Sequence, residues 1–175
     1  LDCEDGAPVG GELDHANMVA ALAKSAQEAP DLIANGLRRR VGVRLHAVDH
    51  PAFLQDVECV VGGAAHALSY IMLPKVESAA DVDVAVRAMD ALGANAAAIP
   101  LHVLIESPAA VHRAFEIAAH PRVQSISFGL MDFVSAHGGA IPADGMGVAG
   151  QFSHPLVLRA KIEIASACHA HGKVP

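Results

Sequence analysis

The sequence predicts an α/β protein, and within that class an incomplete (β/α)8 TIM barrel. Short apolar runs alternate with amphipathic stretches along the 175 residues, which is the pattern of repeated βα units in a parallel sheet. About five strands are expected, whereas a complete barrel has eight strands and typically ~250 residues. We therefore expect residues 1–175 to form a single (β/α) barrel domain that is truncated at both ends.

The first forty-five residues predict two strands and one helix. Residues 1–4 have the character of a strand end, because acidic and turn residues follow at once. Apolar residues three or four positions apart predict a helix over residues 12–27. Residues 30–40 close with three arginines and predict a solvated connection, and residues 41–45 predict the second strand.

The middle of the chain predicts three helices and two strands. A proline in the first turn begins a helix near residues 49–51, which two glycines stop at 62–63. A strand over residues 68–73 and a helix over residues 78–93 follow. The fourth strand, residues 101–105, leads directly into Ser107 and Pro108, a strong helix start because serine caps and proline fits the first helical position. That helix is expected to reach residue 119.

The last third of the chain continues the same alternation. The fifth strand is expected over residues 123–128, and a short helix over residues 131–136 follows it. Residues 137–150 are rich in glycine and predict a loop. A final helix is expected over residues 155–169, and residues 172–175 are typical of the start of another strand.

Composition excludes several classes of protein. The formal charge is −7 and no basic cluster dominates, so a nucleic-acid partner is not expected. The apolar runs are broken within about ten residues, short of the ~20 that a membrane span needs. Three cysteines without a CxxC pair and an acidic start favour a cytoplasmic protein over a secreted one. The eleven histidines are scattered, which argues against a metal-storage role.

A charged side chain stands at the carboxyl end of every expected strand. Because the carboxyl ends of parallel strands converge at one rim of a barrel, these side chains define the candidate site. In chain order they are Glu4 with Asp5, Arg44, Lys75 with Glu77, Glu106, and Asp132.

Glu106 and Asp132 together predict a Mg²⁺ site. Mg²⁺ binds hard oxygen ligands and keeps several waters, so two carboxylates at adjacent strand ends suffice for it. The alternative for each residue is a structural carboxylate at the start of the next helix. Arg44 interrupts a buried strand with a planar fork that suits a substrate carboxylate, or else it forms an internal salt bridge to Glu4 or Asp5. For Lys75 we expect a structural pairing.

Five segments in register resemble one known family. They resemble the strand-end motifs of the citrate lyase beta subunit and malyl-CoA lyase family, within the HpcH/HpaI aldolase group, and the resemblance spans essentially the whole chain. The segments are Asp2-Cys3-Glu4-Asp5, Val43-Arg44-Leu45-His46, Met72-Leu73-Pro74-Lys75-Val76-Glu77, Leu104-Ile105-Glu106-Ser107 and Phe128-Gly129-Leu130-Met131-Asp132.

The resemblance implies a barrel of the phosphoenolpyruvate/pyruvate-binding type and a Mg²⁺-dependent lyase. Such an enzyme cleaves or forms a carbon-carbon bond of a 3-hydroxy acyl-CoA ester by retro-aldol or Claisen chemistry, with a CoA thioester or a 2-oxo acid as substrate. Carried over by motif, Glu106 and Asp132 are the metal ligands and Arg44 and Glu106 contact the substrate. Glu4 and Asp5 hold metal-bound waters. A homo-oligomer, trimeric or hexameric, is also implied.

Two departures from the family pattern bear on function. His46 stands where the family usually has asparagine, two residues after the arginine. Relatives also carry an acid-base aspartate in a C-terminal segment to which nothing in this chain corresponds. Two alternatives to the acyl-CoA lyase remain open: a class II aldolase that releases pyruvate or glyoxylate from a free hydroxy-oxo acid, and a non-catalytic paralogue that binds a CoA ester. The related aldolases usually have histidine at the position of Asp5, so Asp5 favours the lyase.

Overall fold

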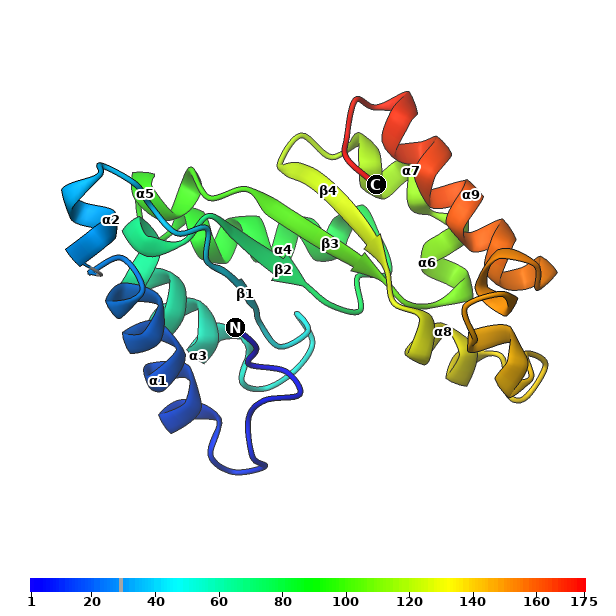
Figure 1. The fold of residues 1–175 in the computed structure, drawn as a ribbon, viewed down its shortest axis with the longest axis horizontal. Coiled ribbons are helices and arrows are strands. Elements are labelled where there is room, and N and C mark those ends of the chain that lie inside the picture. The colour runs from blue at the N-terminus through cyan, green and yellow to red at the C-terminus, as the bar shows by residue number, and fades with distance from the viewer. Residues whose placement is uncertain (29) are drawn as a thin grey trace. The chain divides into compact units, whose positions relative to one another are not determined.

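The computed structural model describes residues 1–28 and 30–175, and it has the expected α/β architecture (Figure 1). Four strands are joined by helical connections. The strands are β1 (Gly42–Arg44), β2 (Tyr70–Leu73), β3 (Leu101–Ile105) and β4 (Val123–Phe128). The α-helices are α1 (Glu12–Ser25), α2 (Pro30–Ala34), α3 (Phe53–Asp56), α4 (Ala79–Asp90), α5 (Ala94–Ala97), α6 (Pro108–His112), α7 (Ala114–Ala119), α8 (Leu130–Ala136) and α9 (Pro155–Ala170).

The strands form one sheet in the order β1-β2-β3-β4, the same as their order along the chain. β1 pairs in parallel with β2, with Val43 opposite Ile71. A parallel neighbour can be reached only through a crossover connection, which the intervening helices supply. The prediction of an α/β fold built from βα units around a parallel sheet is thereby confirmed.

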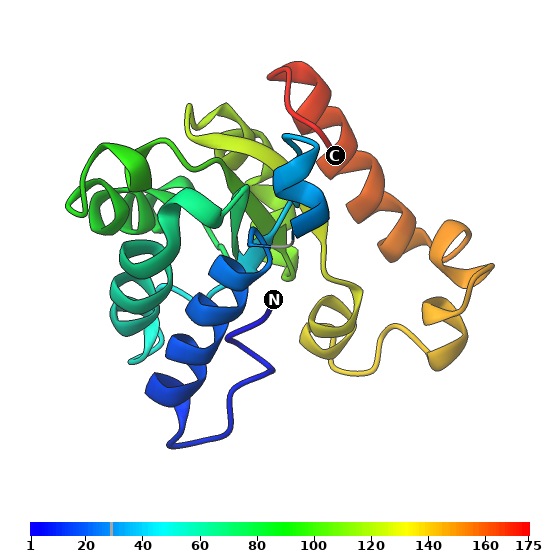
Figure 2. The same ribbon diagram turned by 60° about the vertical axis from the view of Figure 1, so that its left-hand side comes forward.

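The chain divides into two compact units, each described by itself. The first unit comprises residues 1–73 and 83–101, and the second comprises residues 74–82 and 102–175. In the first unit, α1 packs along α3 and along the π-helix η1 (Val57–Gly62) that continues it (Figure 2). Its core is mainly aliphatic, with Val43, Leu45, Ile71 and Val60 at 0% exposure, and it also buries Phe53 of α3.

In the second unit, α9 lies beside α6 and α7 and covers one face of β4. Alternate residues of β3 are buried, as expected for a strand with one face against helices. Ser107 caps α6, because its hydroxyl oxygen accepts a hydrogen bond from the Ala110 backbone N–H at 3.0 Å. The two 3-10 turns, η3 (Ala143–Met146) and η4 (Gly150–Phe152), lie in and just after the expected glycine-rich loop.

Several elements differ from the sequence-based expectation. The strand expected over residues 1–4 is reduced to a single parallel bridge between Asp2 and Arg44. The bridge between Ser125 and Val174, in contrast, agrees with the strand start expected over residues 172–175. Helix α2 begins at Pro30 inside the expected solvated connection. The helix expected from 107 to 119 is divided at Arg113, whose backbone leaves the helical region. The helix after residue 49 widens into η1.

No helix in residues 1–28 and 30–175 combines the length and apolarity needed to cross a membrane.

Candidate functional site

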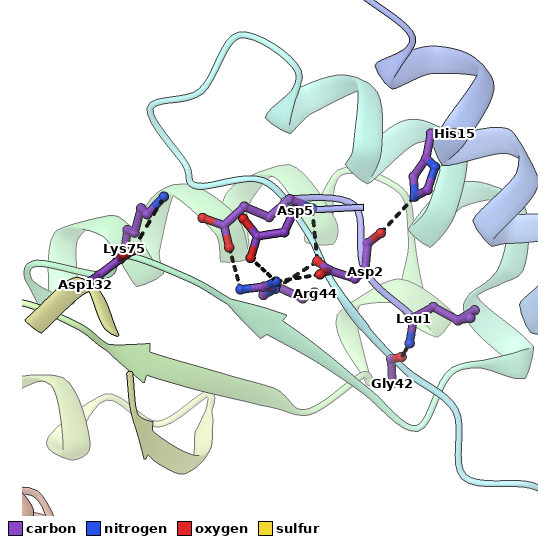
Figure 3. Close-up of polar contacts among 9 residues, drawn as sticks. Leu1, Asp2, Asp5, His15, Gly42, Arg44, Lys75 and Asp132 are labelled. Atoms are coloured by element: carbon purple, nitrogen blue, oxygen red, sulfur yellow. Dashed lines mark hydrogen bonds and ion pairs between the residues drawn. The ribbon is translucent and has the colours of Figure 1, made fainter. Parts of the chain in front are cut away.

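Arg44, the last residue of β1, is surrounded by three carboxylates (Figure 3). Its Nε and one terminal nitrogen donate to both oxygens of Asp2, at 2.8 and 2.5 Å. The same terminal nitrogen lies 2.6 Å from Asp5, and the other terminal nitrogen lies 2.7 Å from Glu4. The internal salt bridge that the sequence left open is therefore present, with Asp2 as an additional, bidentate partner.

The backbone places this cluster, which we call the Arg44 cluster (Asp2, Glu4, Asp5 and Arg44). The Arg44 backbone N–H donates to the Leu1 carbonyl, and the Arg44 carbonyl accepts a hydrogen bond from the Cys3 N–H at 2.8 Å. These two bonds hold the acidic segment against the end of β1. Burial raises the pKa of Asp2, but the hydrogen bond and charge of Arg44 outweigh it and the net pKa is lowered. The hydrogen bonds that Arg44 donates to Asp2 in turn raise the pKa of Arg44. Three carboxylates against one guanidinium leave excess negative charge.

Glu106 immediately follows β3 and is buried, with 8% exposure. Its Oε2 accepts a hydrogen bond from the backbone N–H of Lys75 at 2.9 Å. A buried carboxylate is costly unless it is compensated, and the Lys75 N–H supplies one compensating hydrogen bond.

Lys75 links the two predicted metal ligands. Its backbone N–H contacts Glu106, and its ammonium group lies 3.8 Å from Asp132 (Figure 3). Lys75 also has φ = 51°, the left-handed region that a side chain with a Cβ rarely adopts. Such strain costs about 1–3 kcal/mol and tends to occur where the structure needs a particular group in place. At this position the strained conformation directs the N–H to Glu106.

Gly129 follows β4, and the Glu106 side chain occupies the space where a Cβ on this residue would lie. A Cβ built on Gly129 would come closer to the Glu106 side chain than real Cβ atoms do. The Gly129 N–H donates to the Ile105 carbonyl at 2.9 Å, which holds the ends of β3 and β4 together. Sequence patterns did not distinguish Gly129 from its neighbours, because the need for a glycine there comes from the Glu106 side chain after another strand.

We expect Gly129→Ala to displace the Glu106 carboxylate and to reduce Mg²⁺ affinity by at least about tenfold, since both the added methyl group and Glu106 are confined. Isothermal titration with Mg²⁺ measures this. Gly63→Ala is the matched control, because a Cβ there would meet Ala20 at an ordinary 3.8 Å. Equal Mg²⁺ affinity in the two variants would contradict the role given to Gly129.

Glu106 and Asp132 suit Mg²⁺ in their donor chemistry. Both supply hard oxygen, one is buried and one is half exposed, and Mg²⁺ commonly takes one or two carboxylates with water and substrate completing its shell. The Lys75 ammonium beside Asp132 shows that this carboxylate already attracts a cation. Within the described part of the chain no group of three or more His, Cys, Asp or Glu side chains gathers as a metal cage.

One buried hydrogen-bonded pair was not predicted from the sequence. His46 lies two residues after Arg44 and contacts Asp56 of α3, and both side chains are almost fully buried. The unusual feature in the sequence was the histidine itself, but nothing in the sequence indicated its partner ten residues later.

The chain was compared with known proteins. An L-malyl-CoA/beta-methylmalyl-CoA lyase from Cereibacter sphaeroides is 31% identical, over 100% of this chain and 56% of that protein. A crystal structure of a citrate lyase from Burkholderia xenovorans LB400 is 46% identical with a TM-score of 0.87, over 100% of this chain and 53% of that one. The citrate lyase beta subunit from M. tuberculosis, complexed with oxaloacetate and magnesium, is 25% identical with a TM-score of 0.66, over 99% of this chain and 64% of that one.

This chain therefore spans only about half the length of the lyase sequence and of the first of these structures. The family match nevertheless runs through every strand-end motif, since it covers residues 1–174. The chain belongs to the HpcH/HpaI aldolase/citrate lyase family, as those motifs predicted.

Proposed function

We propose that this protein is a Mg²⁺-dependent carbon-carbon lyase that cleaves, or in reverse forms, a 3-hydroxy acyl-CoA ester. The observation that carries the proposal is the buried Glu106 carboxylate, which a strained Lys75 holds at the carboxyl end of β3. Membership of a family that includes a malyl-CoA lyase and a magnesium-bound citrate lyase beta subunit supports it.

The proposal gives each charged side chain a task. Glu106 and Asp132 would hold Mg²⁺, and the Lys75 ammonium group lies beside Asp132 at 3.8 Å. When bound, the ion supplies a positive charge that polarises a carbonyl oxygen and offsets the negative charge that develops during bond cleavage. Glu4 and Asp5 would orient water through their excess negative charge.

Arg44 would bind the carboxylate of the 2-oxo acid fragment. Its guanidinium pairs with Asp2 through Nε and one terminal nitrogen, which illustrates the affinity of this group for carboxylates. A substrate carboxylate would replace the most exposed partner, Asp5, whose side chain is 76% exposed. A charge-assisted hydrogen bond from the terminal nitrogen that Asp5 now contacts would then orient the carbonyl of the fragment for reaction.

The test is a cleavage assay of the full-length protein against a small panel of 3-hydroxy acyl-CoA thioesters with Mg²⁺. We expect turnover that EDTA abolishes and that added Mg²⁺ restores. Equal turnover of a free hydroxy acid without CoA would indicate the class II aldolase instead. CoA-ester binding without cleavage would indicate the non-catalytic paralogue.

Two further features belong to the same proposal. We expect a homo-oligomer, trimeric or hexameric, and a cytoplasmic location. Light scattering coupled to gel filtration measures the first, and fractionation of the source cells measures the second.

A further inference from the structure

His46, two residues after Arg44, forms a buried pair with Asp56 of α3. One carboxylate oxygen of Asp56 accepts two hydrogen bonds from the same residue: the His46 backbone N–H at 2.8 Å and the ring Nδ1–H at 2.7 Å. Asp56 has 0% exposure and His46 has 5%. A residue that is held at both its backbone and its side chain by one buried acceptor has little freedom to move.

Asp56 also lies close to the acidic segment of the cluster. Burial raises the pKa of Cys3 to about 12, and the Asp56 charge is the next largest cause of that rise. Cys3 is itself buried, and its N–H donates to the Arg44 carbonyl. One buried carboxylate thus lies next to both chain segments of the cluster: residues 1–5, through Cys3, and the residues after β1, through His46.

The outer face of the pair is covered by a second histidine. The His50 ring stacks on the His46 ring with centroids 4.3 Å apart and planes 11° from parallel. His50 is held in turn, because its Nδ1 accepts a hydrogen bond from the Ala52 N–H at 3.1 Å. The short loop between β1 and α3 is therefore fixed at His46 and again at His50.

Packing alone does not account for this arrangement. The second oxygen of Asp56 is buried and has no hydrogen-bond partner in the described part of the structure, which is unfavourable in a largely apolar core. Asp56 also ends α3 at the point where the helix widens into η1, and π-helical turns are frequent at functional sites.

We propose that His46 is a positioning residue for Arg44: anchored to the buried Asp56, it fixes the chain immediately after the arginine and so determines where the guanidinium meets a substrate carboxylate. The backbone of β1 carries the effect. Leu45 lies between the two residues and is tied to β2 by its N–H to the Met72 carbonyl at 3.1 Å, so Arg44 cannot shift independently of His46. The proposal rests on the proposed function in so far as Arg44 binds substrate.

Two substitutions of His46 separate positioning from general stability. His46→Ala removes the ring donor, whereas His46→Asn keeps an N–H near the place of Nδ1 and can still donate to Asp56. His112→Asn, at an exposed position of α6, is the matched control. In His46→Ala we expect amide hydrogen exchange of residues 44–46 to quicken at least about tenfold, with a smaller change in the second unit. In His46→Asn and His112→Asn we expect wild-type exchange.

Substrate measurements complete the test, with glyoxylate and Mg²⁺ as the probe. The Kd for glyoxylate and the KM should rise about tenfold in His46→Ala with kcat within about twofold of wild type, and His46→Asn should recover both, because positioning alters binding before chemistry. Unchanged exchange at residues 44–46 in His46→Ala would overturn the proposal, and so would a fall in kcat with unchanged Kd. If the wild type cleaves no CoA thioester, the proposed function fails, while the exchange data still decide the role of His46.

Discussion

Glu106→Gln should abolish Mg²⁺ binding and reduce kcat by about 10²–10³-fold, because it removes one of two charged ligands from the proposed metal site. The substitution keeps the size of the side chain and its carbonyl oxygen, so the hydrogen bond from the Lys75 N–H can persist. The fold around β3 should therefore stay intact. Titration calorimetry with Mg²⁺ and steady-state kinetics on a CoA thioester measure the two losses.

Glu106→Gln should lose activity without losing stability towards unfolding. Glu106 is buried, and a buried carboxylate carries a desolvation cost that a neutral amide does not. In metal-free buffer we expect Glu106→Gln to be at least as stable as the wild type towards urea. Activity that falls while stability holds or rises is the signature of a residue kept for function.

A matched control is Glu58→Gln, which neutralises an exposed carboxylate of η1. It should change neither Mg²⁺ affinity nor kcat. Unchanged turnover and Mg²⁺ binding in Glu106→Gln would contradict the metal assignment and favour the alternative in which Glu106 only precedes a helix. Loss of Mg²⁺ binding with full turnover would separate the metal from catalysis.

Local patterns predicted the two strands that precede Glu106 and Asp132 in the second unit. β3 and β4 have the bounds expected from sequence, because each is a short apolar run and a helix start follows it closely. Glu106 and Asp132 were placed at their ends for the same reason. The cap at Ser107 was also predicted, since serine followed by proline has one dominant use at a helix start.

Such local patterns could not predict contacts between residues that are far apart in the sequence. The hydrogen bond to Glu106 comes from Lys75, whose backbone is in the left-handed region. A lysine in the sequence does not predict that conformation. Asp2 was not recognised as the bidentate partner of Arg44, because a residue that forms only one bridge shows no strand periodicity. Asp56 was missed for a related reason: an acidic residue in a short helix predicts solvent exposure.

Arg44→Lys should weaken substrate binding far more than it weakens the fold. Lysine keeps the positive charge among Asp2, Glu4 and Asp5 but loses the planar fork that pairs with both oxygens of a carboxylate. A charge-assisted hydrogen bond contributes about 1.5–3 kcal/mol, which corresponds to about a 10- to 100-fold loss of affinity. We expect this loss in the Kd for glyoxylate and in KM, with a smaller change in kcat, because the carboxylate is held in the ground state as well as in the transition state.

Stability measurements and a control complete the case for Arg44. The retained charge still offsets the three carboxylates, whose ion pairs are partly exposed, so urea unfolding should lose only about 1 kcal/mol. Arg87→Lys, at an exposed position of α4, should leave affinity and stability unchanged. If Arg44→Lys binds glyoxylate as tightly as the wild type but unfolds much more easily, Arg44 serves the internal salt bridge alone. If affinity falls while the free energy of unfolding changes little, Arg44 binds the substrate carboxylate. In that case we expect the substrate to displace Asp5, the most exposed partner of the guanidinium.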